Sequence, residues 1–489
     1  MSKPLNMVFI MCDDHTSQAI SAYGKSEIET PNIDLLYKNG IRFDNACCTN
    51  SLCAPSRASI LTGKYSNNNG VRTLKDNLDH TNTVFPEILQ EAGYNTALIG
   101  KWHLGHGKDY NPKGFASWDI LIDQGEYFNP VFETNVTSEK ANNIETSTLD
   151  TASNDTLRVS VEGYVTDIIT DKSIRYIESI DKTKPFFLMC NHKAPHRPFI
   201  PSTKYKDLYV NHEFSYPETF NDDYETRSPA ATKAKMRIEQ LTKTDTKKDP
   251  PPNLSSKEEK EWKYQRFMQD YFACVKSIDD SVGAIIDCLK RNDLLDNTII
   301  FYTSDQGFYL GEHGWFDKRF MYEESLNMPL IIYHPSYVGK SRIISDLVAN
   351  IDFAPTILEL AQVEANFDCD GKSFAKLITS ESDTRLHDYI YYRYWDYPSP
   401  HNVLPHFGIK NDKYKLMCFY LSKRSEDILS DTNEGIPIKD ILNNPDKYET
   451  WWELYDLTDG SHECDNKIDN VKYKEIINKM KDLLISAAI

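Results

Sequence analysis

Residues 7–14 read MVFIMCDD, an apolar run of strand length that ends in two aspartates. The run is too short for a secretory signal peptide, and no small-residue cleavage site follows it. We therefore interpret Met7–Cys12 as a buried strand. Similar apolar runs occur at Asn95–Gly100, Pro185–Asn191 and Thr298–Thr303, with helical patterns between them. Short strands that alternate with helices indicate an α/β fold, with a largely parallel sheet and helices on both faces.

The segment before Thr298 shows the clearest helical pattern. Its apolar residues recur at intervals of three and four, which predicts one wide apolar helix face. These residues are Phe267, Tyr271, Val275, Ile278, Val282, Ile285 and Leu289. Two other stretches, Thr134–Asp155 and Lys243–Glu261, are polar, and the second contains a run of prolines. We expect both to be exposed surface segments.

The sequence changes character after about residue 380. Aromatic, strand-like segments at Tyr389–Trp395, His406–Tyr420 and Trp451–Leu457 have no helical pattern between them. A final helical pattern follows, and its apolar face consists of Tyr473, Ile476, Ile477, Met480, Leu483 and Leu484. We predict a large α/β domain over residues 1–380 and a small subdomain over residues 381–489, an antiparallel sheet that carries one helix.

The composition limits the class of protein. The 489 residues suit one large domain with a smaller companion. The chain has 55 Lys and Arg residues against 73 Asp and Glu residues, and this net charge of −18 argues against a nucleic-acid partner. No stretch reaches the ~20 apolar residues of a membrane span, so we expect no membrane partner. A complete chain would stay in the cytoplasm, whereas loss of a signal peptide would make it periplasmic or secreted, so the localisation stays open.

Acidic and amide side chains follow two of the predicted strands. Asp13 and Asp14 come after Met7–Cys12, and Asp305 and Gln306 come after Thr298–Thr303. Ligands of open parallel sheets bind beyond the carboxyl ends of the strands. Carboxylate and amide oxygens suit a hard cation such as calcium. Each pair taken alone would more often start a turn or cap a helix.

Cys53 differs from the other cysteines. The ten cysteines form no CxxC pair, and most lie in apolar runs that are typical of buried thiols. Cys53 opens the sequence CAPSR (53–57), just before the helical run Ala58–Thr62. A cysteine at a helix start meets the positive end of the macrodipole, where an anion also binds, and Arg57 lies one turn later. A buried structural thiol is the alternative, and the spacing does not decide between the two.

Basic residues follow two further strands. Lys101 and His103 come after Asn95–Gly100, while His192 and His196 come after Pro185–Asn191. Histidine suits proton transfer or metal binding near neutral pH. A single histidine of this kind more often has a structural role than a catalytic one. Lys318, taken by itself, could be any surface lysine.

The combination resembles a known family. Residues Cys53 to Gly63 match the type I sulfatase signature, C-x-P-S-R-x-x-x-L-T-G, at every defined position. The resemblance covers nearly the whole chain, in the order that the family shows. It extends through Met11–His15, Gly100–Gly105, His192–Pro198, Thr303–Gly314, Lys318–Glu323 and Trp452–Leu457.

The resemblance implies a fold and a nucleophile. The fold would be alkaline-phosphatase-like, a large mixed sheet flanked by helices with a small C-terminal antiparallel subdomain. A separate maturation enzyme would oxidise Cys53 to formylglycine, and one hydroxyl of the hydrated aldehyde would attack sulfur. One Ca²⁺ ion would be bound by Asp13, Asp14, Asp305, Gln306 and the modified Cys53. The family often has Asn or His where Gln306 stands, but an amide oxygen can still bind the ion.

The resemblance also implies roles for the basic residues. Arg57, Lys101 and Lys318 would stabilise charge on the sulfuryl oxygens. His196 would protonate the leaving oxygen, and His103 would assist the formylglycine hydroxyls. His192 would line the substrate cleft.

Three stretches indicate the substrate class. Thr303–Glu324, Tyr397–Gly408 and the predicted helix that begins at Trp262–Gln265 resemble the branch that contains N-acetylglucosamine-6-sulfatases and related mucin- or glycosaminoglycan-desulfating enzymes. We expect a sulfated carbohydrate, bound in a monosaccharide-sized, exo-acting pocket. His401 and His406 would contact sugar hydroxyls, because a neutral imidazole both donates and accepts. A packed aromatic edge of the subdomain is the alternative for both.

Two rival functions remain. The first is a phosphoester or phosphonate hydrolase of the same superfamily, but its phosphatases hold two metals through additional Asp and His ligands. Here Arg57, Lys101 and Lys318 occupy the region of a second metal, which favours a monoanionic sulfate ester and one cation. The second rival is a catalytically silent glycan-binding protein that keeps Cys53 as a thiol. The intact set of catalytic residues speaks against it.

Overall fold

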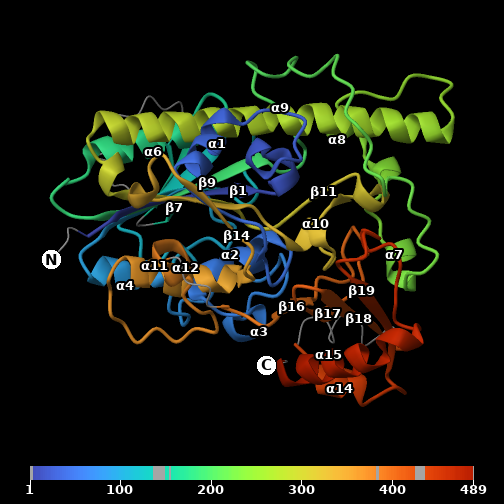
Figure 1. The fold of residues 1–489 in the computed structure, drawn as a ribbon. Coiled ribbons are helices and arrows are strands. Elements are labelled where there is room, and N and C mark those ends of the chain that lie inside the picture. Colours follow the sequence, from blue (N-terminus) through green and yellow to red (C-terminus); the bar gives the residue numbers. More distant parts are fainter. Residues whose placement is uncertain (1–3, 136–148, 154–155, 381–384, 425–434, 488–489) are drawn as a thin grey trace.

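A computed structural model of the chain describes residues 4–135, 149–153, 156–380, 385–424 and 435–487. In this part of the chain, eleven strands form one mixed sheet through the larger part of the molecule (Figure 1). Their spatial order is β14 (Ser341–Ile344), β2 (Gly40–Phe43), β13 (Leu330–Tyr333), β10 (Thr298–Ser304), β1 (Asn6–Asp13), β9 (Phe186–Pro195), β4 (Asn95–Lys101), β5 (Ser117–Leu121), β6 (Val131–Thr134), β8 (Thr156–Ser160) and β7 (Leu149–Ser153).

The centre of the sheet is parallel, as predicted. Strands β10, β1, β9, β4 and β5 lie side by side in this order and pair in parallel with one another, and the four predicted strands are β1, β4, β9 and β10. Antiparallel pairs, β13 beside β10 on one side and β6 beside β5 on the other, make the whole sheet mixed. The carboxyl ends of the four predicted strands therefore meet at one edge.

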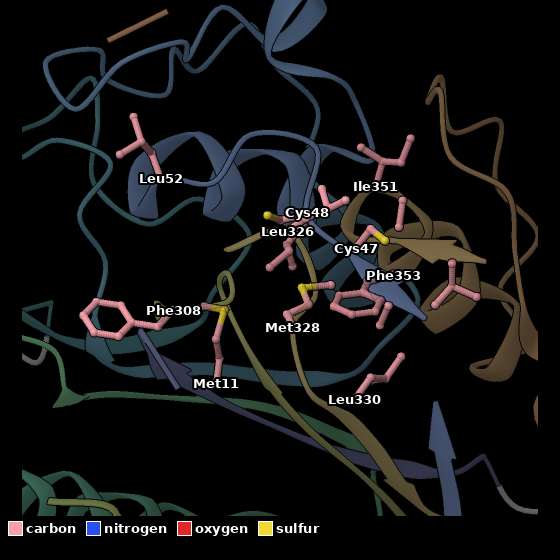
Figure 2. Close-up of a cluster of buried hydrophobic side chains, with 14 of the residues drawn as sticks. Met11, Cys47, Cys48, Leu52, Phe308, Leu326, Met328, Leu330, Ile351 and Phe353 are labelled. Atoms are coloured by element: carbon pink, nitrogen blue, oxygen red, sulfur yellow. The ribbon is translucent and has the colours of Figure 1, made fainter. Parts of the chain in front are cut away.

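Alternate side chains of β1 enter two apolar clusters. Met7, Phe9 and Met11 join the cluster that includes α2 (Cys53–Thr62), α4 (Phe85–Glu91) and α11 (Phe353–Leu360). Figure 2 shows part of this cluster, with Met11 on the sheet side and Leu52, just before α2, on the helix side. Val8, Ile10 and Cys12 join the opposite cluster, which includes α1 (Pro31–Lys38), α6 (Val165–Ser179) and α9 (Ser256–Arg291). Helices thus cover both faces, as Figure 1 shows.

Helix α9 confirms the predicted apolar face, whose seven residues are all buried. Ser255 caps its first turn, because the Ser255 hydroxyl accepts a hydrogen bond from the Glu258 amide. The prediction that Lys243–Glu261 is an exposed segment is wrong at Asp245 and Thr246, which are buried, whereas Ser256–Glu261 contains no buried residue. Lys243–Thr246 forms helix α8 with a buried Asp245, and Ser256–Glu261 belongs to α9.

The predicted surface loop Thr134–Asp155 is also wrong in its described parts. Thr134 ends β6, and Leu149–Ser153 forms β7 at the edge of the sheet. The rest of this prediction, at 136–148 and 154–155, lies outside the described residues. No helix in the described part of the chain is both long and apolar enough to cross a membrane.

A separate four-stranded antiparallel sheet follows near the C-terminus (Figure 1). Its strands are β16 (Ile390–Tyr394), β17 (His406–Lys410), β18 (Tyr414–Ser422) and β19 (Tyr448–Asp456), accompanied by α14 (Ile438–Leu442) and α15 (Lys474–Ala487). The segment predicted as one strand, His406–Tyr420, is a hairpin instead, because the Asn411 side chain accepts from the Lys413 and Tyr414 amides. The predicted last helix is confirmed, while the domain boundary at residue 380 stays a prediction.

Close packing at Gly100 gives a test of the sheet. Gly100 has a φ of +107°, and a Cβ atom there would lie 1.9 Å from the Asn191 carbonyl oxygen on β9. Gly93 has a φ of +91° but open space around it, so Gly93→Ala should cost only the backbone strain, about 1–2 kcal/mol. We expect Gly100→Ala to cost more than about 4 kcal/mol in urea unfolding, because strand β4 must move away from β9. Equal losses for both variants would contradict this account.

Candidate active site

The predicted acidic residues meet at the carboxyl ends of two neighbouring strands. Asp13 ends β1, and Asp305 follows the parallel strand β10. Carboxylate oxygens of Asp13, Asp14 and Asp305 lie within 4.8 Å of one another, and all three residues are fully buried. Asp14 adopts the left-handed conformation with a φ of 67°, which is a strained state for a residue with a side chain.

Gln306 completes a set of oxygen donors. Its Nε2 atom donates to Asp14 Oδ1 at 2.6 Å. Its Oε1 atom is buried and has no hydrogen-bond partner among the described residues. A buried unpartnered acceptor beside three carboxylates fits a hard cation that takes oxygen ligands.

The negative charge on Asp14 and on Asp305 is unfavourable without a bound cation. Burial raises the pKa of Asp14 to about 7, and Asp13 and Asp305 add to the rise while Lys318 opposes it. Burial likewise raises the pKa of Asp305 to about 6, with Asp13 adding and Arg57 opposing. A bound cation would favour the ionised form of both groups.

Three basic side chains each pair with one carboxylate. Arg57 Nε and Nη2 lie 3.0 and 2.9 Å from Asp305 Oδ2. Lys318 Nζ donates to Asp14 Oδ2 at 2.6 Å, and Lys101 Nζ donates to Asp13. Each predicted cation therefore lies in the cluster.

Cys53 is the first residue of α2 and lies inside the cluster. Its Sγ atom donates to Asp13 Oδ1 at 3.3 Å, and Gln306 Nε2 lies 3.8 Å away. Burial raises the pKa of the thiol to about 12, and the charge of Asp13 adds to the rise. The thiol is protonated at neutral pH and is therefore a poor nucleophile as it stands.

The residues around Cys53 anchor helix α2. The Ser56 hydroxyl donates to the Asp305 carbonyl, and Asn350 Nδ2 donates to Ser56 Oγ at 2.9 Å. Gly63 ends the helix in the left-handed conformation, with a φ of 64°. A Cβ atom at Gly63 would lie 2.8 Å from Cys369 Cβ, so both the conformation and the packing require glycine.

His196 lies at the accessible side of the cluster. Its Nε2 atom is 3.7 Å from Asp14 Oδ2, and its side chain keeps 15% of its surface exposed whereas Asp13 and Lys101 keep none. Its Nδ1 atom lies 2.7 Å from the Arg197 carbonyl. Burial lowers the pKa of His196 well below its ordinary value, with Lys101 adding and Asp13 opposing, so the ring is neutral. Arg197 is held by the buried Asp245 of α8.

His103 is joined to Lys101 by a residue that the sequence analysis missed. Gln124 Oε1 accepts from Lys101 Nζ at 2.5 Å, and Gln124 Nε2 lies 3.2 Å from His103 Nε2. Lys193 Nζ donates to the Gln124 carbonyl at 3.0 Å. Its position in the sequence could have identified Gln124, because it follows β5, and β5 pairs in parallel with β4, which ends at Lys101.

The structure contradicts the cleft-lining role of His192. On β9 its side chain shares a face with Leu188 and Cys190, which belong to the cluster under α9. The ring is fully buried, and its Nε2 atom lies 3.0 Å from Ser281 Oγ of α9. His192 therefore packs against the helix instead of lining the cluster at the strand ends.

The two subdomain histidines differ. His406 is fully buried and stacks on Tyr392 with ring centres 5.5 Å apart, which contradicts a sugar contact and fits the packed aromatic alternative. His401 Nε2 lies 3.3 Å from Asp317 Oδ2, next to Lys318. The sugar contact of His401 stays a prediction.

Comparison with known proteins identifies the family. Residues 5–363 match the family model described as Sulfatase, which is more than half of the chain. The chain belongs to the sulfatase family. A second model, described as N-sulphoglucosamine sulphohydrolase, C-terminal, matches residues 311–450 of this sulfatase. Membership makes the protein a sulfuric ester hydrolase, and the predicted enzyme class is confirmed.

Individual relatives agree with the family. The sulfatase is 37% identical to an N-acetylglucosamine-6-O-sulfatase of Bacteroides thetaiotaomicron, over 99% of this chain and 85% of the relative. It is 27% identical to an N-acetylglucosamine-6-sulfatase of Capra hircus, over 98% and 82% of the two chains. A solved complex of a protein with its substrate, D-glucosamine-2-N,6-O-disulfate, superposes with a TM-score of 0.84, at 36% identity and covering 99% and 97% of the chains.

The alkaline-phosphatase-like fold of the sulfatase is also confirmed. The structure of a phosphonate monoester hydrolase of Agrobacterium radiobacter superposes with a TM-score of 0.71, covering 99% and 95% of the two chains. Its identity of 17% supports a common fold alone.

The pairing of Arg57 with Asp305 predicts a large effect on stability. In metal-free protein, Arg57→Met should lower the free energy of unfolding by about 3–5 kcal/mol, because it leaves a buried carboxylate without its partner. Lys204→Met removes an ion pair whose side chains are 67% and 41% exposed, and it should cost less than about 1 kcal/mol. Urea unfolding in EDTA compares the two variants. If Arg57→Met lowered the free energy of unfolding no more than Lys204→Met, the result would contradict the proposal that Arg57 balances the buried charge of Asp305.

Proposed function

We propose that this sulfatase hydrolyses the 6-O-sulfate ester of a sulfated amino sugar such as N-acetylglucosamine-6-sulfate, acting at the end of a glycosaminoglycan or mucin glycan. The 37% identity to an N-acetylglucosamine-6-O-sulfatase over 99% of the chain carries the proposal. The intact cluster of cations and carboxylates around Cys53 supports it. Residues 1–380 would form the catalytic domain, and residues 381–489 would bring His401 to the substrate.

Cys53 would act after conversion to formylglycine by a maturation enzyme. Two observations support this step, the match to the family signature and the raised pKa of the buried thiol. Formylglycine would supply a hydrated aldehyde, whose hydroxyl is an oxygen nucleophile in place of sulfur. Arg57, Lys101 and Lys318 would stabilise the negative charge on the sulfuryl oxygens.

His196 would protonate the oxygen of the leaving sugar. Its side chain keeps 15% of its surface exposed and its Nε2 atom lies 3.7 Å from Asp14 Oδ2, so we expect a sugar to reach the cluster from this side. The ring is neutral in the substrate-free protein, and the negative charge of a bound sulfate ester would favour its protonation. The hydrogen bond between Nδ1 and the Arg197 carbonyl would keep the ring in place.

Calcium is the cation that best fits the oxygen donors. Asp13, Asp14, Asp305 and Gln306 would hold it, together with the modified residue 53. The unpartnered Gln306 Oε1 atom supports this assignment. The ion would supply positive charge beside the sulfate group.

A panel of substrates tests the function. We expect sulfate release from N-acetylglucosamine-6-sulfate, measured by ion chromatography, and at least about a 10⁴-fold lower kcat in Cys53→Ala. Cys288→Ala, which removes a buried thiol of α9, should keep the wild-type rate. Preferred cleavage of glucosamine-N-sulfate would favour the activity named by the model that matches residues 311–450. Preferred cleavage of a sugar phosphate would overturn the sulfatase assignment.

Mass spectrometry of the same preparation tests whether Cys53 has been converted to formylglycine. The tryptic peptide Phe43–Arg57 contains Cys47, Cys48 and Cys53. After reduction and alkylation, mass spectrometry should find two alkylated cysteines and an aldehyde at position 53. Three alkylated cysteines in an active preparation would contradict formylglycine chemistry.

Cation binding should depend on pH. The raised pKa values of Asp14, about 7, and Asp305, about 6, mean that protons occupy these carboxyls below those pH values and compete with the cation. Calcium affinity should therefore rise with pH and be at least about tenfold weaker at pH 5.5 than at pH 7.5. Calorimetric titration with Ca²⁺ alone measures it, and Asp222→Asn, outside the cluster, should leave the affinity unchanged. Equal affinities at the two pH values would contradict the assigned ligands.

A further inference from the structure

Gln124 lies between two of the predicted catalytic residues. Its side chain contacts Lys101 Nζ through Oε1 and His103 Nε2 through Nε2, at 2.5 and 3.2 Å. Its main chain is held as well, because Lys193 Nζ donates to the Gln124 carbonyl at 3.0 Å. Lys193 is itself buried, with its ammonium 5.0 Å from the centre of the Tyr127 ring. Hydrogen bonds therefore hold both the side-chain amide and the main chain of Gln124 in place.

The contacts determine which way the amide points. A lysine ammonium only donates hydrogen bonds, so Lys101 must face the amide oxygen of Gln124. The amide NH₂ group then faces His103, and it too only donates. His103 Nε2 must therefore accept this hydrogen bond.

The proton of His103 follows from this. Burial holds the pKa of His103 well below its ordinary value, and Lys101 adds to the effect while Asp13 opposes it, so the ring is neutral. A neutral imidazole carries one proton, and Nε2 is an acceptor, so the proton lies on Nδ1.

The Nδ1–H group has no hydrogen-bond partner in the described part of the chain. Among the described residues, no hydrogen-bond acceptor meets His103 Nδ1, although the atom is buried. An unpartnered buried donor costs about 1–3 kcal/mol. The ring is also held by strained backbone, since His103 has a φ of 58°. The charges that act on it, those of Lys101, Asp13 and Arg57, belong to the cluster around Cys53.

We propose that Gln124 is a positioning residue that fixes His103 as its Nδ1–H tautomer, so that this N–H donates to an oxygen bound at position 53. The same amide holds Lys101 through its oxygen, so one side chain sets the direction of two catalytic groups. The proposal rests on the proposed function, because the acceptor is an oxygen of the formylglycine hydrate or of its sulfate.

Gln124→Glu separates the two contacts. The carboxylate keeps the size of the side chain and still accepts from Lys101, but it has no N–H for His103. At pH 8, where the ring is neutral, His103 would place its proton on Nε2 and lose the Nδ1–H donor. We expect kcat to fall about tenfold to a hundredfold, with KM changed by less than about threefold and an unchanged thermal midpoint.

Two further variants distinguish this role from a structural one. Gln124→Leu loses both contacts and should be impaired at least as much as Gln124→Glu. Gln90→Glu, at an exposed glutamine of α4, should match the wild type. If Gln124 served only to anchor Lys101, Gln124→Glu would keep the wild-type kcat while Gln124→Leu lost it, and the proposal would be overturned.

The tautomer can be measured without activity. In protein with ¹⁵N-labelled histidine rings, and with His103→Asn to assign the signal, we expect a protonated Nδ1 in the wild type and a protonated Nε2 in Gln124→Glu. An Nε2–H tautomer in the wild type would overturn the inference. An inactive wild type with the expected tautomer would instead count against the proposed function and leave this inference standing.

Discussion

Three carboxylates buried side by side are the constraint on which the rest of the structure depends. Two like charges about 4 Å apart repel by about 4 kcal/mol at an effective dielectric constant of about 20. Each carboxylate is balanced by one cation, Asp13 by Lys101, Asp14 by Lys318 and Asp305 by Arg57. These pairs tie the end of β4, the segment after β12 (Phe316–Asp317) and helix α2 to the ends of β1 and β10.

The sheet order makes this convergence possible. β1 lies between β10 and β9, and β9 lies beside β4, so four parallel strands deliver their carboxyl ends to one edge. Helices on both faces exclude water from the strands, and the low dielectric that makes the carboxylates costly also strengthens their ion pairs. Backbone strain is located at the same edge, at Asp14 and His103, where surrounding contacts hold both residues in place.

Features that depend on local pattern were predictable from the sequence. The apolar runs predicted β1, β4, β9 and β10, and the acidic residues directly after two of them predicted where the carboxylates meet. Features that depend on distant partners were not. Asp245 is buried because Arg197 reaches it from another segment, and Gln124 matters because two parallel strands bring it beside Lys101. The hairpin between β17 and β18 was missed because its turn is short, although Asn411 and Asp412 both favour turns.

His192 and His196 show that sequence-based prediction also fails for residues close together in the chain. They are four positions apart in one segment, but the first points under α9 and the second toward Asp14. Residue type and spacing cannot separate them, since the alternation of β9 and the course of the chain after it decide where each ring lies.

The distance in sequence between the two halves of the cluster has a consequence for biosynthesis. Arg57 and Asp305 are 248 positions apart, which a ribosome covers in about 10–50 s at about 5–20 residues per second. During that interval helix α2, whose ten residues are all buried in the folded protein, has no strand β10 to dock against. Cys53 is thus accessible on the nascent chain and is enclosed once β10 and Lys318 have been made.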